Sequence, residues 1–435
     1  MNIRTASNPA ELTAKLDLAQ PGDRIELSAA DYGALTTSHK FAPPGITIAS
    51  VDWNAPATFS GKVEVLGAKG MAFDRLLIGP KKVEVIGGSD IAFRNSIFEG
   101  ALDPVTGVGG KMGVFFKQVI RPVFENNEVF HWVKLFKVAG CDDAVVRFNN
   151  FHSFNMDAVN ANACLGLLYE GNWMHDRLFE GEGHGDMFQT WNTSPTRPAT
   201  DYEIRGNFFD MGTGRRVQTI FMRNGRAEGT GDLDLYYKNI LIEDNVIYNG
   251  HVHGISIGET VGLLVQQNTL LRANGEKNDA PQIRALGPLI DRQTIDNILH
   301  KFNAGGQFLV QDTNPGGVNY YGDLFVDAMK VGATLDDLRA VTGGPIETGD
   351  FGAELTRIAL PFVTGPQVSA SEPSTPAVPD DTVPVATVED VAALTERLDA
   401  LELEFLAFVD RATANETRIA NHEARLDAIA TGGAG

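Results

Sequence analysis

The chain has 435 residues and is 43% hydrophobic, so it is long enough for a large core and a second module. Its formal net charge of −20, without any run of Lys or Arg, argues against duplex nucleic acid and anionic membranes as partners, because both would repel it. The N-terminal segment has no apolar signal-peptide core, and no stretch is long enough to span a bilayer.

The first predicted element is a short amphipathic helix over residues 8–19. Asn8 or Ser7 can cap its N-terminus, and Leu12 and Leu16 would face the core. Short strands with alternating apolar residues are predicted next, at 24–27, 46–50, 63–66 and 83–86.

A sequence motif then recurs along the chain, in which apolar and polar residues alternate around one marked polar residue. The marked positions are Ser96, Asn127, Asn149, Asn172, Asn207, Asn245, Asn268 and Asn297. Several of these positions lie 22 or 23 residues apart and the others are spaced further, which indicates one structural unit used many times with insertions. No helical pattern separates the strands, which argues against a doubly wound fold or a TIM barrel.

This unit predicts an all-β fold, a right-handed parallel β-helix over residues 1–345, with 346–365 as a terminal coil. Asn suits the turns because it tolerates the left-handed conformation, and stacked amides can hydrogen-bond from coil to coil. The N-terminal helix would cap the open strand edges of the first coil. A β-sandwich with incidental Asn turns is the alternative.

The capping helix, the segment QPGDRIEL at 20–27 and the Asn-marked coils resemble the pectate-lyase-like β-helix superfamily. The resemblance covers about residues 1–345 and implies the fold. It leaves the activity open, because this superfamily includes lyases, hydrolases and non-catalytic adhesins.

Three other features of these coils lead to structural predictions. Cys141 and Cys164 lie 23 residues apart, about one coil, and are predicted to be buried thiols rather than a disulfide. His131, His152 and His175 recur near the turns and are predicted to be stacked or surface histidines. No Cys/His spacing indicates a zinc site.

One strand of each coil can be aligned by its apolar core. The aligned segments are 135–139, 158–162, 187–191, 219–223, 254–258, 282–286 and 307–311. Their outward residues would form one stacked face, because neighbouring strands lie about 4.8 Å apart. The predicted substrate-binding residues on this face are Lys137, Asn160, Asn162, Gln189, Trp191, Arg223 and Ser256. Amides, cations and an exposed indole suit sugars, whereas an ordinary solvated sheet face is the alternative.

Candidate catalytic residues lie just before these strands. Asp157 and Asp186 are expected on neighbouring coils, where paired carboxylates can act as acid and base in glycoside hydrolysis. The phrases NMDAVN, HGDMFQTW, VHGISIG and QIRA resemble the ordered polygalacturonase motifs, which implies catalytic roles for Asp157, Asp186, His253 and Arg284. The chain departs from that family where a single Asp replaces a pair and where 67 residues separate Asp186 from His253, so that an extra coil intervenes.

Uronate lyases of the same superfamily imply a different chemistry, β-elimination. That resemblance makes Lys137, Arg223 and Arg284 the candidate bases. It also implies calcium, with Asp232 and Asp234 as the candidate ligands. The hydrolase interpretation needs neither a metal nor another cofactor.

Composition changes after the predicted β-helix. Residues 366–387 are rich in Pro, Ser, Thr and Asp and are predicted to form a semi-extended linker. Residues 388–431 carry heptads typical of an α-helical coiled coil. Asn415 and His422 fall at core positions and resemble the polar layers of trimeric fibre stalks, which favours a parallel homotrimer. A single helix packed on the β-helix is the alternative.

A trimeric β-helix with a coiled coil resembles phage tailspikes and tail fibres. The resemblance implies a protein of the virion tail, or an extracellular one, that binds a bacterial surface polysaccharide, and it leaves open whether the protein also depolymerises that polysaccharide. Attachment to a baseplate or adaptor protein would use the coiled coil or a cap. The alternatives are a non-catalytic trimeric receptor-binding fibre or adhesin, and a secreted uronate lyase.

Overall fold

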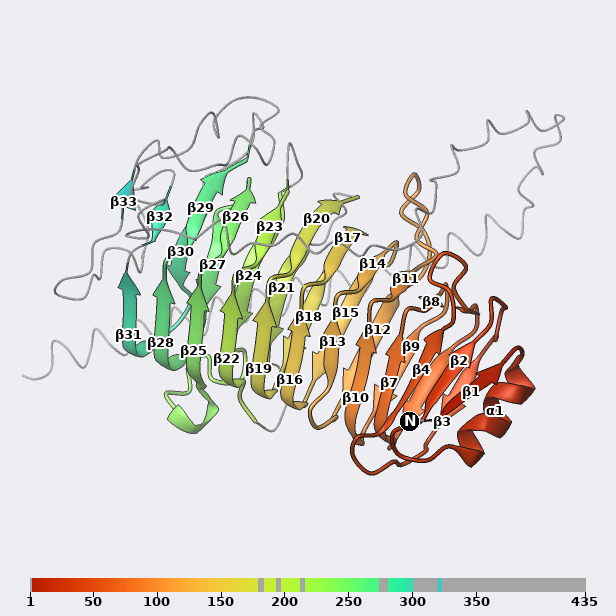
Figure 1. Cartoon of the computed structure of the whole chain (residues 1–435). Helices are drawn as coiled ribbons and strands as arrows, with labels where there is room; N and C mark the ends of the chain where they lie inside the picture. The colour runs from red at the N-terminus through yellow and green to blue at the C-terminus, as the bar shows by residue number, and fades with distance from the viewer. Residues whose placement is uncertain are drawn as a thin grey trace, which may run out of the picture. The chain divides into compact units, whose positions relative to one another are not determined.

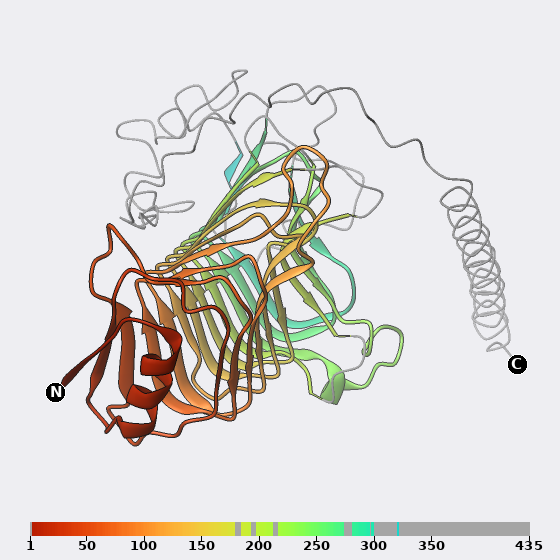
Figure 2. The ribbon, with the colours of Figure 1, turned by 90° about the vertical axis from the view of Figure 1, so that its right-hand side faces the viewer.

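The computed structural model describes residues 2–178, 184–192, 197–211, 216–273, 281–295, 297–299 and 320–321. Over these residues the chain winds into coils whose strands stack as three parallel sheets (Figure 1 and Figure 2). Consecutive strands of the chain generally enter different sheets, so most strands pair with the third strand before and the third strand after them. This is a parallel β-helix, as the Asn-marked repeat predicts.

The three sheets, A, B and C, contain the following strands in spatial order. Sheet A contains β1 (Ile3–Ala6), β2 (Arg24–Leu27), β4 (Ile46–Ser50), β7 (Lys69–Asp74), β10 (Ser89–Arg94), β13 (Val123–Glu125), β16 (Asp142–Arg147), β19 (Leu165–Glu170), β22 (Thr200–Arg205), β25 (Tyr237–Glu243), β28 (Thr260–Gln266) and β31 (Leu289–Ile295). Sheet B contains β5 (Thr58–Phe59), β8 (Leu77–Ile78), β11 (Ile97–Glu99), β14 (Glu128–Phe130), β17 (Asn150–Phe154), β20 (Trp173–Arg177), β23 (Phe208–Asp210), β26 (Val246–Asn249), β29 (Thr269–Arg272), β32 (Ile298–Leu299) and β33 (Tyr320–Tyr321). Sheet C contains β3 (Leu35–Thr37), β6 (Val63–Leu66), β9 (Val83–Ile86), β12 (Met112–Lys117), β15 (Lys134–Ala139), β18 (Val159–Asn162), β21 (Asp186–Trp191), β24 (Gln218–Arg223), β27 (His253–Ile257) and β30 (Gln282–Ala285).

The core lies between the sheets, and the alternation of the strands sets which side chains enter it. In sheet C the register stacks one inward residue of each coil on the next, and all of these side chains are buried. They are Phe136, Val159, Phe188, Ile220, Ile255 and Ile283. The predicted alignment of these six segments is therefore confirmed, while the seventh, at 307–311, lies outside the described residues.

An amide ladder fixes one edge of the coils. The Asn149 backbone N–H and its Nδ2 donate to Asn172 Oδ1 at 3.0 and 2.9 Å, and Nδ2 also donates to the Phe124 carbonyl at 2.9 Å. The same pattern runs from Asn127 to Asn268, and all eight predicted positions are at most 1% exposed. Each ladder Asn therefore satisfies backbone groups that the turn leaves unpaired.

One detail of the turn differs from the sequence prediction. The left-handed residue is the one before the ladder position, as at Phe148 with φ 55° and Asp244 with φ 54°. The ladder Asn is needed for its amide, whereas the preceding residue absorbs the positive φ.

The N-terminal helix α1 (Pro9–Leu18) is also as predicted. Asn8 Oδ1 accepts from the Glu11 N–H at 2.9 Å, and Leu12 and Leu16 are buried. A short 3₁₀ helix, η1 (Leu233–Leu235), is the other helical element among the described residues. Within this part of the chain, no helix is long and apolar enough to cross a membrane.

The cysteine and histidine predictions are confirmed. Cys141 and Cys164 are buried free thiols, and burial raises their pKa values to about 12 and about 11. His152 and His175 stack with ring centroids 4.9 Å apart. Residues 346–365, the linker at 366–387 and the heptads at 388–431 lie outside the described residues, so the coiled coil and the trimer remain predictions.

Replacing a ladder residue tests this account of the fold. Asn245→Leu removes bonds to Asn268 and to the Ile204 carbonyl, so it should lower the free energy of unfolding by about 1–3 kcal/mol. Denaturant unfolding followed by circular dichroism measures the effect. The control, Asn54→Leu at an exposed turn, should change stability by at most about 0.5 kcal/mol. Equal midpoints for both variants would contradict the ladder's role.

Candidate functional site

The register of sheet C builds one outward column across six coils. Its members, in order along the sheet, are Lys137, Asn160, Gln189, Phe221, Ser256 and Arg284. A second column lies two residues further along the strands, where Trp191 pairs with Arg223 and the Trp191 N–H donates to Asn162 Oδ1 at 3.0 Å. The predicted substrate-binding residues therefore share one face of one sheet.

Asp157 and Asp186 meet on neighbouring coils. The Asp186 N–H donates to Asp157 Oδ1 at 3.3 Å, and Lys134 Nζ lies 2.6 Å from Asp157 Oδ2. Burial, and then the charge of Asp157, raises the pKa of Asp186 well above its usual range. Asp186 Oδ1 is buried without a hydrogen-bond partner. The pair therefore combines a carboxylate neutralised by Lys134 with a carboxyl that favours its protonated form.

Three of the four polygalacturonase-like segments contain the same contact between residues three apart. Asn160 Nδ2 donates to Asp157 Oδ2 at 3.1 Å, and Gln189 Nε2 donates to Asp186 Oδ2. His253 Nδ1 lies 2.8 Å from Ser256 Oγ. Asp157, just before β18, and Asp186 and His253, the first residues of β21 and β27, are thus each bonded to a side chain of the outward column of sheet C.

These contacts change the expected roles of three residues. Sequence reasoning placed Asn160, Gln189 and Ser256 on the surface as sugar ligands, whereas their exposed fractions are 6%, 8% and 0%. Their polar atoms are directed to the neighbouring acid or imidazole instead of to solvent. In this structure they orient Asp157, Asp186 and His253.

His253 and Arg284 form a separate pair. Arg284 Nη1 lies 3.3 Å from His253 Nε2, and the His251 ring stacks on His253 with centroids 5.1 Å apart. Burial, and then the neighbouring His253, lowers the pKa of His251 to about 4. Burial, and then the charge of Arg284, lowers the pKa of His253 to about 4. Strand β24 lies between this pair and Asp186. The polygalacturonase-like set is therefore divided into two pairs about 10 Å apart rather than gathered in one cluster.

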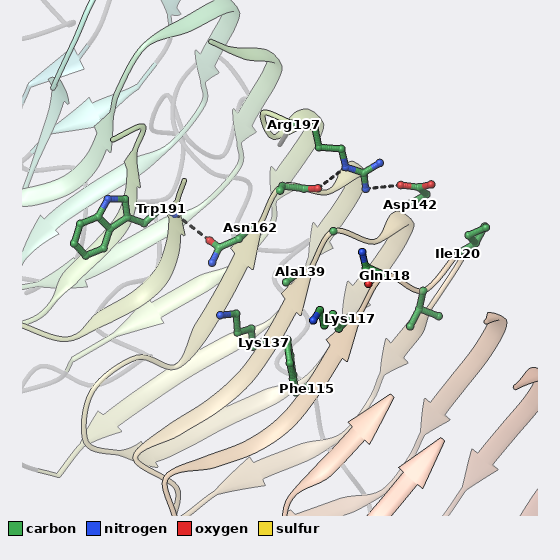
Figure 3. A pocket seen from close by; sticks show the side chains of 13 residues that line it. Phe115, Lys117, Gln118, Ile120, Lys137, Ala139, Asp142, Asn162, Trp191 and Arg197 are labelled. Atoms are coloured by element: carbon green, nitrogen blue, oxygen red, sulfur yellow. Dashed lines mark hydrogen bonds and ion pairs between the residues drawn. The ribbon is translucent and has the colours of Figure 1, made fainter. Parts of the chain in front are cut away.

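A cationic groove of about 820 Å³ lies on sheet C, where β12, β15, β18 and β21 run side by side (Figure 3). Its walls include Phe115, Lys117, Lys137, Asn162 and Trp191. Burial, and then the charge of Lys134, lowers the pKa of Lys137. Lys137 Nζ also lies over the Phe115 ring, 5.6 Å from its centroid.

Other cations near the groove are held by the protein itself. Arg197 donates to the Ala163 and Cys141 carbonyls at 2.7 and 2.9 Å and lies 2.5 Å from Asp142. Arg223 stacks over Trp191 at 5.6 Å and pairs with Glu228 at 3.0 Å. Lys117 and Lys137 have no carboxylate within ion-pair distance in the described part of the chain.

On sheet A, arginines pair with carboxylates of the neighbouring strands. Arg94 and Arg147 both pair with Glu125, at 2.9 and 2.7 Å, and Arg205 pairs with Glu170 at 3.0 Å. The arginines of that face neutralise their own neighbours. The lysines of the groove leave positive charge available to an external anion, in a chain whose formal net charge is −20.

Lys134 and Lys117 were missed by the sequence interpretation. Lys134 precedes the inward Phe136 by two residues, the same offset that singled out Asp157 and Asp186. Applying the same two-residue offset to the segment 135–139 would have identified Lys134 from the sequence. Lys117 lies one coil before the aligned segments, so nothing in that alignment pointed to it.

The candidate calcium ligands have a structural role. Asp232 Oδ1 accepts from the Asp234 N–H at 3.0 Å and caps the 3₁₀ helix η1. Among the residues that the structure describes, no group of three or more His, Cys, Asp or Glu side chains is arranged to hold a metal ion.

Three stacked parallel sheets with an internal amide ladder define a parallel β-helix protein, and solved structures with that architecture are similar to it. No protein family and no curated protein matches the sequence. The alginate lyase from Paenibacillus sp. str. FPU-7 has a TM-score of 0.43 and 14% identity, over 74% of this chain and 98% of that chain. The Streptococcus pneumoniae surface adhesin PfbA has a TM-score of 0.46 and 10% identity, over 72% of this chain and 95% of that chain. The Dettilon tailspike protein has a TM-score of 0.41 and 9% identity, over 74% of this chain and 65% of that chain. The likeness is in architecture alone.

The buried carboxyl leads to a pH-dependent prediction. The pKa of Asp186 in the folded chain lies above its ordinary value of 3.8, so above that pH the unfolded chain releases a proton that the folded chain retains. Rising pH therefore favours unfolding until the folded-state pKa is passed. Asp186→Asn, which cannot ionise, should stabilise the protein near pH 8, and this advantage should shrink toward pH 4.

Denaturant midpoints of the variant and the unsubstituted protein across this pH range measure the difference. Asp201→Asn, at an exposed aspartate of sheet A, is the control and should show no such trend. A difference between Asp186→Asn and the unsubstituted protein that stays constant with pH would contradict a buried protonated carboxyl.

Proposed function

We propose that this protein binds an acidic polysaccharide along the outer face of sheet C and cleaves it by β-elimination. The observation that carries the proposal is the groove in which Lys117 and Lys137 lie beside Phe115 and Trp191 and have no carboxylate partner among the described residues. Cations match the carboxylates of uronic acids, and exposed aromatic rings match the C–H faces of sugar rings.

Lys137 is the proposed base. In β-elimination a base removes the proton from the carbon that carries the carboxylate, a double bond forms to the adjacent carbon, and the glycosidic oxygen leaves and takes up a proton. A lowered pKa gives Lys137 a larger neutral fraction, which a base requires. Lys117, which also lines the groove, would neutralise the substrate carboxylate.

Hydrolysis is the second candidate, and the carboxyl pair favours it. Asp186, a carboxyl whose pKa is raised by burial, lies beside the ion-paired carboxylate of Asp157, and the two resemble an acid and a base. However, Asp157 and Asp186 are only 3% and 0% exposed, so neither reaches a glycosidic oxygen on the surface without a rearrangement. Elimination by the more accessible Lys137 needs no such movement.

Product analysis separates these chemistries. Uronate polysaccharides incubated with the protein should yield shortened chains whose new ends absorb in the ultraviolet as unsaturated uronates. Lys137→Gln should abolish cleavage, while the control Lys81→Gln, at an exposed loop position, should not change it.

Two other results would support a hydrolase or a non-catalytic adhesin instead of a lyase. Saturated products whose formation is lost in Asp186→Asn would identify a hydrolase. Binding without any shortening would contradict the enzyme proposal and leave the receptor-binding adhesin. In that case the Trp191→Ala, Arg223→Ala double variant should weaken binding.

We also propose that the chain acts as a homotrimer, in the manner of a tailspike or tail fibre on a virion or at a cell exterior. The heptads at 388–431 and the polar Asn415 and His422 positions support this. Light scattering should give three times the chain mass for the full chain and one chain mass after truncation at residue 365. A monomeric full chain would refute the stalk.

A further inference from the structure

Between β15 and β30, the outward column of sheet C has a cation at each end of this segment and none between. Lys137 on β15 and Arg284 on β30 are five strand steps apart, and Phe115 on β12 precedes Lys137 in the same column. At about 4.8 Å per step, the two ends are about 24 Å apart. The four residues between them are uncharged and at most 9% exposed: Asn160, Gln189, Phe221 and Ser256.

The first end is the groove already described. Lys137 lies there with Lys117 on the preceding strand, and Lys134 lies nearby in its ion pair with Asp157. Neither Lys117 nor Lys137 has a carboxylate partner within the described ranges, so the first end presents two such cations.

The second end has different chemistry. Arg284 is half-buried against His253, and none of the described carboxylates lies within ion-pair distance of its guanidinium. His251 and Phe221 pack against His253 with ring centroids 5.1 and 5.7 Å away. These rings bring no negative charge, so Arg284 keeps its planar fork of donors for an external carboxylate.

In the middle of the face, the guanidinium of Arg223 is paired with Glu228, so the contact offered there is mainly aromatic. Trp191, on β21 within the span, is 36% exposed and borders the groove. Its indole can stack on a sugar ring between the two ends. A polymer that follows the column therefore meets cations, then a stacking surface, then a guanidinium.

We propose that the two ends are separate anion subsites, so that an acidic oligosaccharide gains affinity in a step once it is long enough to bridge them. This rests on the proposed polysaccharide function and adds a length requirement to it. After the first carboxylate binds at Lys137, the second contact at Arg284 becomes intramolecular and benefits from a high effective concentration. Shorter oligosaccharides would bind at the first end alone.

Size-fractionated oligouronates and the full chain test this inference. Affinity is followed by stopped-flow tryptophan fluorescence, at times before cleavage. The affinity should rise by at least on the order of 100-fold across a narrow range of lengths. Arg284→Gln should remove this rise and leave the affinity for short oligosaccharides unchanged.

Two controls fix the interpretation. Arg272→Gln, on sheet B, should keep the step, and neutral oligosaccharides of the same lengths should show none. A smooth dependence on length, or a step that survives Arg284→Gln, would overturn the two-subsite inference while leaving acidic polysaccharide binding intact. Absence of binding at every length would overturn the proposed function and this inference with it.

Discussion

Parallel pairing of successive coils in register is the constraint on which the rest of this structure depends. The amide ladder from Ser96 to Asn297 fixes each turn against the next, so corresponding residues of successive coils fall into columns. A column repeats at the strand spacing of about 4.8 Å, which no single strand or loop could provide. Both the stacked hydrophobic core and the candidate site follow from this spacing.

The same register explains how charge is distributed. On sheet A it places Glu125 between Arg94 and Arg147, and the positive charges there are neutralised within the face. On sheet C it places Lys137 next to Asn160, so the lysine has no acidic neighbour on that side. Asp157 pairs with Lys134 instead, and this leaves the groove cationic.

Much of this arrangement was predictable from the sequence, because a strand with one buried face allows one register. The Asn repeat predicted the coils, and the equal offsets of Asp157 and Asp186 predicted their contact. The burial of Gln189 was not predictable, since alternation marks it as outward but does not reveal that its amide turns to Asp186. The left-handed residue at Phe148 was also missed, because ladder and turn roles fall on adjacent positions.

Covalent labelling of lysines tests the central claim, that the outer face of sheet C is the polysaccharide-binding surface. Amine acylation of the full chain, read by mass spectrometry, should be slowed at Lys117 and Lys137 when an acidic polysaccharide is present, and a neutral polysaccharide should have no effect. Lys40 and Lys69 are exposed away from the groove and serve as internal references that should react equally in all samples. Protection of the reference lysines with full reactivity at Lys117 and Lys137 would contradict this account.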